Sequence, residues 1–212
     1  KRVKRGLSTF SSPFVLHNLI YFGLLGFAFL FVEIPLLQRF ILYLGSPAYA
    51  VTTVLFSLLL FSGIGSQVSS RIPLRVALGA LVVLVLVMPA LLTRLFGWTL
   101  GLPLAARLGV TVMALAPLGL LMGIPFPGGI RLLTHRTGQG VESQTELAAR
   151  AEISWIWAVN GAASVISPLL AALLALTFGF SDVLRLGAAC YAAALLTVWV
   201  FLRPRAPRRP LR

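Results

Sequence analysis

The chain has 212 residues, of which 58% are hydrophobic and only 11% are charged. A water-soluble domain carries about 25% charged residues, so this composition excludes an ordinary soluble protein. The net charge of +13 points to nucleic acid or to anionic lipid as a partner. Because the basic residues cluster at the termini and in short loops, with no aromatic stacking platform among them, the sequence favours a membrane protein with no nucleic-acid partner.

Six stretches are mainly apolar over about 20 residues, the length that crosses the hydrocarbon layer of a bilayer. They predict an all-α, polytopic transmembrane bundle of six helices over residues 14–34, 48–67, 74–95, 105–127, 153–180 and 183–202. This transmembrane domain, 14–202, is flanked by a basic N-terminal segment, 1–13, and a basic Pro/Arg tail, 203–212. The first apolar run is longer than the roughly 7–15 residues of a signal-peptide core, so we expect a retained span.

Positive charge is divided unequally between the two sides of the predicted bundle. If both termini are cytoplasmic, the outer side holds only Arg39, Arg94, Arg107 and Arg185, and all other Lys and Arg residues lie inside. Cytoplasmic loops carry an excess of Lys and Arg. We therefore expect both termini to be cytoplasmic, in a multi-pass protein of a bacterial-type inner (cytoplasmic) membrane.

Glu33 is a carboxylate near the outer end of the first predicted span. Ionisable residues within a membrane span are costly and mark a functional or structural role. Because Pro35 lacks an N–H and restricts the residue before it, we expect the helix to break at Ile34, with residues 36–44 lying along the outer interface as an amphipathic segment. Three interpretations stay open: Glu33 pairs with Arg39 or caps the broken segment, binds a proton or cation, or extends to water.

Two further spans contain small residues, and one of these two also contains several prolines. In the second span, Ser62, Gly63, Gly65 and Ser66 predict close helix packing. In the fourth span, the run APLGLLMGIPFPGG should break the helix repeatedly, and it forms either a turn at the inner interface or a break that lines a ligand cavity. Arg131 follows this run, where it can reach phosphate headgroups or a buried carboxylate.

Asn160 and Ser164 are four residues apart in the fifth span and therefore share one helix face. They predict either hydrogen bonds between helices or a face that lines a substrate site. The connection before this span, 131–152, should lie on the inner side. Its first part, THRTGQG, is expected to be a loop, and its second part, from Glu142, a short surface helix.

The sequence lacks the usual signatures of catalysis. It contains no Ser-His-Asp arrangement, no HExxH motif and no pair of carboxylates within one plausible site. The single cysteine, Cys190, lies in an apolar run, and neither a CxxC motif nor a His-rich tract supports a metal site. We therefore expect a protein that is not an enzyme, with no catalytic residue, no metal ligand and no cofactor.

Three stretches together resemble a known family: residues 26–66, 117–133 and 155–180. With their VEIPLLQRF and WIWAVNGAAS patterns, they are similar to the membrane half of the integral-membrane spermidine-synthase-like proteins, also described as fused major-facilitator/spermidine-synthase proteins. In that family a soluble Rossmann-like domain of the aminopropyltransferase type is joined to membrane helices. The resemblance implies that this chain is the membrane part and that synthase activity does not carry over.

The resemblance extends over about residues 21–202 and includes ten positions that match the family's motifs. These are Glu33, Gln38, Arg39, Pro47, Tyr49, Pro125, Pro127, Arg131, Asn160 and Ser164. All of them except Pro47 form the functional or structural polar network that we predict. The chain departs from the family in having Ser46 where a larger polar residue, often His, precedes the proline, and Pro168 where a small residue is common.

Two functions of different classes follow from these observations. The favoured one is a non-catalytic accessory, anchoring or scaffold subunit of a larger membrane assembly. Its basic tails would contact anionic headgroups, and its helices would pack against partner membrane helices or against other copies in a homo-oligomer. It predicts no continuous cavity and a contact between Glu33 and Arg39. The alternative is a membrane domain that binds or transports a small cation or polyamine at Glu33, which predicts a polar cavity connecting Glu33 with Asn160 or with the break near Pro125.

Overall fold

The computed structural model describes the backbone of residues 13–137 and 143–201, and the side chains of residues 16–134 and 153–200. These ranges are helical and contain no strand. The helices are α2 (Pro13–Leu44), α3 (Pro47–Val68), α4 (Leu74–Thr99), α5 (Leu104–Met122), α6 (Pro125–Thr137), α7 (Ser143–Phe178) and α8 (Phe180–Phe201). They provide six stretches long and apolar enough to cross a membrane, α5 and α6 together forming the fourth, so the predicted number of spans is confirmed.

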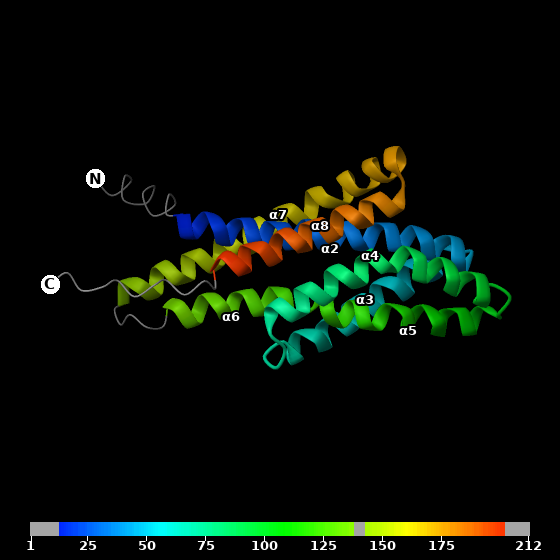
Figure 1. Ribbon diagram of the computed structural model, residues 1–212, viewed down its shortest axis with the longest axis horizontal. Coiled ribbons are helices and arrows are strands. Elements are labelled where there is room, and N and C mark those ends of the chain that lie inside the picture. Colours follow the sequence, from blue (N-terminus) through cyan, green and yellow to red (C-terminus); the bar gives the residue numbers. More distant parts are fainter. Residues whose placement is uncertain (1–12, 138–142, 202–212) are drawn as a thin grey trace.

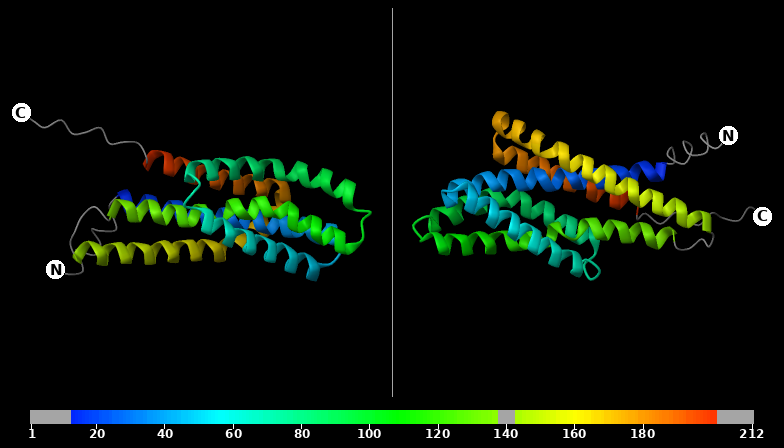
Figure 2. Two further views of the ribbon diagram at one scale, coloured as in Figure 1. Left: turned by 90° about the horizontal axis from the view of Figure 1, so that it is seen from below. Right: turned by 180° about the vertical axis from the view of Figure 1, so that it is seen from behind.

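The long helix α2 lies at the centre of the bundle. It packs mainly against α7 and α8, while α3 pairs with α5 and α4 lies against α8 (Figures 1 and 2). Glycines allow the close approach of these helices: a Cβ at Gly26 would lie 2.7 Å from the carbonyl oxygen of Asn160, and one at Gly187 would lie 2.9 Å from Cγ2 of Val32. Small residues at the contact are the usual means by which membrane helices pack tightly.

The structure contradicts the predicted helix break at Ile34. Helix α2 continues through Pro35 to Leu44, so residues 36–44 are not a separate interfacial segment. Proline removes one backbone hydrogen bond, but Pro35 is buried, and Leu36 and Phe40 beyond it are fully buried in the core. Membrane helices tolerate proline where neighbouring helices surround it, and here tertiary packing outweighs the local preference.

The close packing predicted for the second span is confirmed at one of its two glycines. A Cβ at Gly65 would overlap the backbone carbonyl of Leu120 in α5, whereas one at Gly63 would have nothing within 4 Å. On the other helix, a Cβ at Gly119 would lie 2.8 Å from Cβ of Phe61. Gly65 and Gly119 therefore set the distance between α3 and α5.

The fourth span is interrupted as predicted, but at a single place and not repeatedly. Helix α5 ends at Met122 and α6 begins at Pro125, so only Gly123 and Ile124 separate the two helices. Proline is favoured at the first position of a helix, because the N–H that it lacks has no partner there. The hydroxyl of Tyr21 donates a 2.8 Å hydrogen bond to the carbonyl of Pro125 and fastens the start of α6 to α2.

The connection between the fourth and fifth spans differs from its prediction. The expected loop is helical as far as Thr137, in α6, and the expected surface helix is the beginning of α7, which runs on from Ser143 into the span. Residues 138–142 lie outside the described residues, as do 1–12 and 202–212, which contain nearly all of the two basic terminal segments.

At the end of the bundle where α4 joins α5, the side chain of Tyr43 links three helices. Its ring stacks on Phe96 of α4 at a centroid distance of 4.2 Å and an interplanar angle of 9°. The Thr99 hydroxyl donates to the carbonyl of Leu95 and therefore accepts the 2.7 Å hydrogen bond that it shares with Tyr43. From α5, Nη1 of Arg107 donates to the carbonyl of Tyr43 at 2.7 Å, and its guanidinium carbon lies 5.9 Å from the ring centroid.

Candidate functional site

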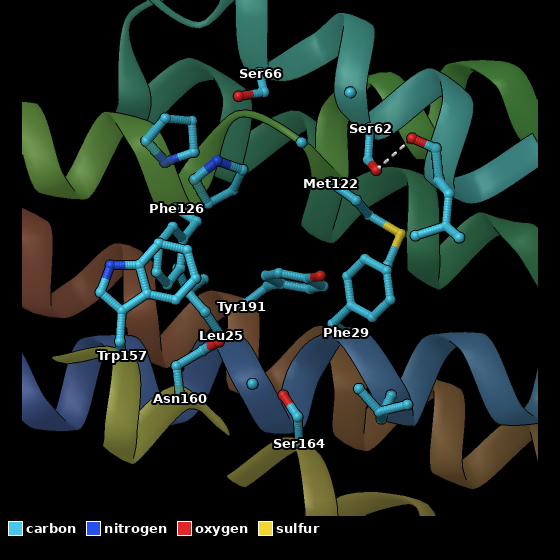
Figure 3. A pocket seen from close by; sticks show the side chains of 17 residues that line it. Leu25, Phe29, Ser62, Ser66, Met122, Phe126, Trp157, Asn160, Ser164 and Tyr191 are labelled. Carbon is cyan, nitrogen blue, oxygen red and sulfur yellow. Dashed lines mark hydrogen bonds between the residues drawn. The ribbon is translucent and has the colours of Figure 1, made fainter. Parts of the chain in front are cut away.

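A cavity of about 500 Å³ lies beside the break between α5 and α6 (Figure 3). We call it the α3–α7 groove, because α3 and α7 form its two rims and α2, α8 and the α5–α6 break form its walls. Ligand sites typically measure about 300–1,000 Å³ and combine apolar walls with a few polar groups. The residues that line it are Leu25, Gly26, Phe29, Leu30, Leu59, Ser62, Gly63, Ser66, Met122, Gly123, Pro125, Phe126, Pro127, Trp157, Asn160, Ser164 and Tyr191.

The groove opens sideways through the surface of the bundle. Helices α3 and α7 are not packed against each other, and at the rims Leu59 is 64% exposed and Trp157 is 58% exposed. The surface next to the rims is also apolar, with Ile64 exposed on α3 and Val165 on α7. In a bilayer this opening therefore faces the hydrocarbon of the lipid.

Polar groups enter the groove from three helices. Asn160 and Ser164 extend from α7, and Nδ2 of Asn160 donates a 2.9 Å hydrogen bond to the carbonyl of Phe22 in α2. Ser62 of α3 donates its hydroxyl hydrogen to the carbonyl of Leu59 at 3.1 Å, so only the acceptor side of this hydroxyl remains free (Figure 3). The side chain of Tyr191 comes from α8.

Tyr191 is the most buried polar side chain of the groove. It is 2% exposed, and in the described part of the chain its hydroxyl makes no hydrogen bond. Figure 3 shows its ring across the back of the groove, with the hydroxyl directed toward Phe29. With no partner from the described chain, this hydroxyl is available to a bound molecule as a donor or an acceptor.

The prolines near the groove leave carbonyl groups without their helical donors. Pro127 has no N–H to offer the carbonyl of Gly123, which receives no hydrogen bond from the described residues. Pro168 in α7 likewise cannot donate to the carbonyl of Ser164. Unpaired carbonyls beside a cavity are the feature that lets interrupted membrane helices bind ligands.

Four of the nine predicted site residues come together in the groove: Pro125, Pro127, Asn160 and Ser164. Arg131 lies one turn beyond Pro127 on α6, and its Nη2 donates to the carbonyl of Ser69 at the end of α3. Gln38 and Tyr49 are exposed and do not line the groove. The nine residues therefore do not form one network.

Glu33 and Arg39 do not form the contact predicted for them. The guanidinium of Arg39 donates from Nη1 to the carbonyl of Pro89 at 3.2 Å and from Nη2 to Oγ of Ser181 at 2.7 Å, which connects α2 with α4 and α8. Glu33 is half-buried and makes neither an ion pair nor a hydrogen bond within the described residues. Side chains six residues apart in a continuous helix point about 120° apart, so the pairing required the break that does not occur.

Glu33 nevertheless lies on the groove side of α2. It follows Phe29 by four residues and Leu30 by three, and both of these residues line the groove. Side chains at these spacings lie on one helix face, one turn apart. The carboxylate is therefore one turn beyond the groove, at the end away from Arg131.

Sequence reasoning missed the aromatic side chains of the site. Phe29, Phe126, Trp157 and Tyr191 all line the groove, and the rings of Phe126 and Trp157 lie 4.7 Å apart. A periodic apolar pattern does not distinguish an aromatic residue that faces a cavity from one that faces lipid or core. The signals for the position of the cavity were the interrupted fourth span and the shared polar face of Asn160 and Ser164.

Comparisons of the chain with protein-family models, with curated proteins and with solved structures find no match. The likeness to spermidine-synthase-like membrane proteins remains a prediction from its motifs. Among the residues that the structure describes, no cluster of three or more His, Cys, Asp or Glu side chains could hold a metal ion.

Proposed function

We propose that this chain is a membrane-embedded ligand-binding domain, of the kind found in carriers, and that the α3–α7 groove is its binding site. The observation that supports the proposal is the coincidence of a 500 Å³ cavity with an interrupted span. Non-helical backbone at membrane depth is tolerated where it lines a cavity, and it supplies ligands in transporters. This differs from a site centred on Glu33, because the groove is lined by aromatic rings, hydroxyls and an amide.

The matched variants Ser164→Phe and Val165→Phe test this function. Ser164 lines the groove, whereas Val165 is 72% exposed on the same helix and does not line it. The purified protein in non-ionic detergent is screened by thermal shift against decanol, decanoate, decylamine, decyltrimethylammonium and spermidine. We expect at least one compound to stabilise the native chain and Val165→Phe by several degrees and to leave Ser164→Phe unchanged, because the added ring occupies the site.

Two results would contradict the proposal. Either no compound of the panel raises the melting temperature of the native protein, or a compound that does so stabilises Ser164→Phe to the same degree. In both cases the groove is not a ligand site.

The scaffold function remains a second candidate, because α7 is poorly enclosed. Only 22% of its most apolar stretch is buried, the smallest share of the six spans, and Leu169, Leu173 and Leu176 are 69%, 61% and 83% exposed. Lipid alone can cover such a face, but so can a helix of a partner or of a second copy. The scaffold function predicted no continuous cavity, so it does not account for the groove.

Cysteine cross-linking in native membranes tests the scaffold candidate. In a Cys190→Ser background, Leu173→Cys is oxidised and compared with Met113→Cys, which is 72% exposed on α5. A cross-linked species specific to Leu173→Cys is expected if α7 is the docking face. Equal cross-linking at both positions, or none at Leu173→Cys, counts against a scaffold that docks through α7.

The predicted orientation is part of the proposal. Both termini on the cytoplasmic side of a bacterial-type inner membrane would leave Arg39, Arg94, Arg107 and Arg185 outside and all other Lys and Arg residues inside. The six apolar helices themselves support a multi-pass membrane protein.

A further inference from the structure

The charged groups around the α3–α7 groove are arranged asymmetrically. None of its 17 lining residues carries a charge of either sign, so the asymmetry comes from the groups at its two ends. The nearest carboxylate on the same face of α2 is Glu33, one turn beyond Phe29, and it has no partner among the described residues. The nearest guanidinium along α6 is that of Arg131, at the opposite end, where it is bonded to Ser69. A positive group is therefore favoured in the groove, toward its Glu33 end.

Three acceptor atoms of the groove suit the same charge. The hydroxyl of Ser62 donates its hydrogen to a backbone carbonyl, which leaves its oxygen as an acceptor. Asn160 uses one of its two amide N–H groups on the carbonyl of Phe22, and its Oδ1 is a further acceptor. The carbonyl of Gly123 is a further acceptor without a donor in the described chain. Acceptors that lie in an apolar cavity attract a molecule that supplies hydrogen-bond donors or positive charge.

The aromatic lining suits an organic cation rather than a metal ion. Four aromatic side chains line the groove, and the faces of such rings attract ammonium groups, most strongly those of tryptophan and tyrosine. A polyamine fits less well, because each additional ammonium would lie against apolar walls without a carboxylate of its own. The lateral opening at Leu59 and Trp157, which faces hydrocarbon, favours a ligand with an apolar body.

We propose that the α3–α7 groove binds a monovalent organic cation with a hydrocarbon chain, an alkylammonium amphiphile, which reaches it from the bilayer. This inference rests on the proposed function and adds the substrate class. The cationic head lies beside Phe29 and Tyr191, toward Glu33, and the hydrocarbon chain extends through the opening between α3 and α7.

The experiment measures binding of radiolabelled decyltrimethylammonium and of decanol to the intact chain in non-ionic detergent. We expect the cation to bind at least about tenfold more tightly than the alcohol, in keeping with a desolvated cation–π site and one carboxylate. Glu33→Gln should weaken binding of the cation about tenfold and leave that of decanol unchanged. Phe29→Leu should also weaken binding of the cation selectively, because Phe29 is the lining aromatic residue one turn from Glu33.

Asp182→Asn is the matched control for removal of a negative charge. Asp182 is at the start of α8, 2.5 Å from Arg185, and does not line the groove. We expect this variant to bind the cation as the native chain does. An equal loss in Asp182→Asn and Glu33→Gln would show a general charge effect and would overturn the inference.

Other outcomes separate this inference from the proposed function. If decanol binds as tightly as the cation and Ser164→Phe abolishes both, the groove is a ligand site but the proposed substrate class is wrong. Tighter binding of spermidine than of decyltrimethylammonium would likewise overturn the substrate class alone. If neither decanol nor the cation binds and the wider panel gives no ligand, both proposals fail.

Discussion

Replacing Tyr43 by alanine is expected to destabilise the bundle by about 3–5 kcal/mol, the usual cost of truncating a large buried aromatic side chain. Tyr43 is 2% exposed and joins α2 to Phe96 and Thr99 of α4 and to Arg107 of α5. Alanine leaves a cavity and removes the ring that lies under the guanidinium. Thermal unfolding in non-ionic detergent should show a fall of about 10 °C or more.

A graded series separates the contributions of the ring and the hydroxyl. Tyr43→Phe keeps the stacking on Phe96 and loses only the hydrogen bond to Thr99, so we expect a loss of about 1 kcal/mol. The control is Tyr49→Ala, because Tyr49 is 51% exposed and should contribute little. If Tyr43→Ala and Tyr49→Ala melt at the same temperature, Tyr43 does not join the three helices in the way the structure shows.

Replacing Gly65 by alanine is expected to separate α3 from α5. The added Cβ would overlap the carbonyl of Leu120, which belongs to the backbone of α5 and cannot rotate away as a side chain can. Overpacking of this kind costs about 1–3 kcal/mol, so the melting temperature should fall by about 5 °C. Valine at the same position should cost more.

Gly63→Ala is the matched control, since a Cβ at Gly63 would have nothing within 4 Å. Alanine is the better helix former, by about 1 kcal/mol in water, so this variant should be as stable as the native chain or more stable. If Gly65→Ala and Gly63→Ala lose the same stability, the loss does not come from the contact between α3 and α5, and this explanation of Gly65 is wrong.

The sequence alone predicted the number of spans, the interruption of the fourth span, and the shared face of Asn160 and Ser164. Each of these features follows from residues that are neighbours in the sequence. The length of an apolar run gives the span, the N–H that proline lacks gives the interruption, and the helical repeat gives the shared face. The helix is interrupted only at Gly123 and Ile124. Pro117 and Pro127 lie nearby but are inside α5 and α6, respectively.

The incorrect predictions concern interactions between distant parts of the chain. Pro35 was expected to end a helix, yet the burial of Leu36 and Phe40 carries α2 through it. The same continuity places Arg39 against Pro89 and Ser181 instead of Glu33. No local pattern distinguishes Gly65 from Gly63, or identifies Tyr191 as a groove residue, because both properties depend on which helix lies opposite.

The opening between α3 and α7 also determines which concentration controls occupancy of the groove. A molecule that arrives through this opening comes from the hydrocarbon phase, since the exposed residues around it are apolar. Its mole fraction in the lipid, set by its partition coefficient, then governs saturation, and its aqueous concentration matters only through that partition. Half-saturation should therefore shift with the ratio of lipid to protein. Affinities measured in different detergents or bilayers become comparable only after the ligand concentration is expressed per mole of detergent or lipid.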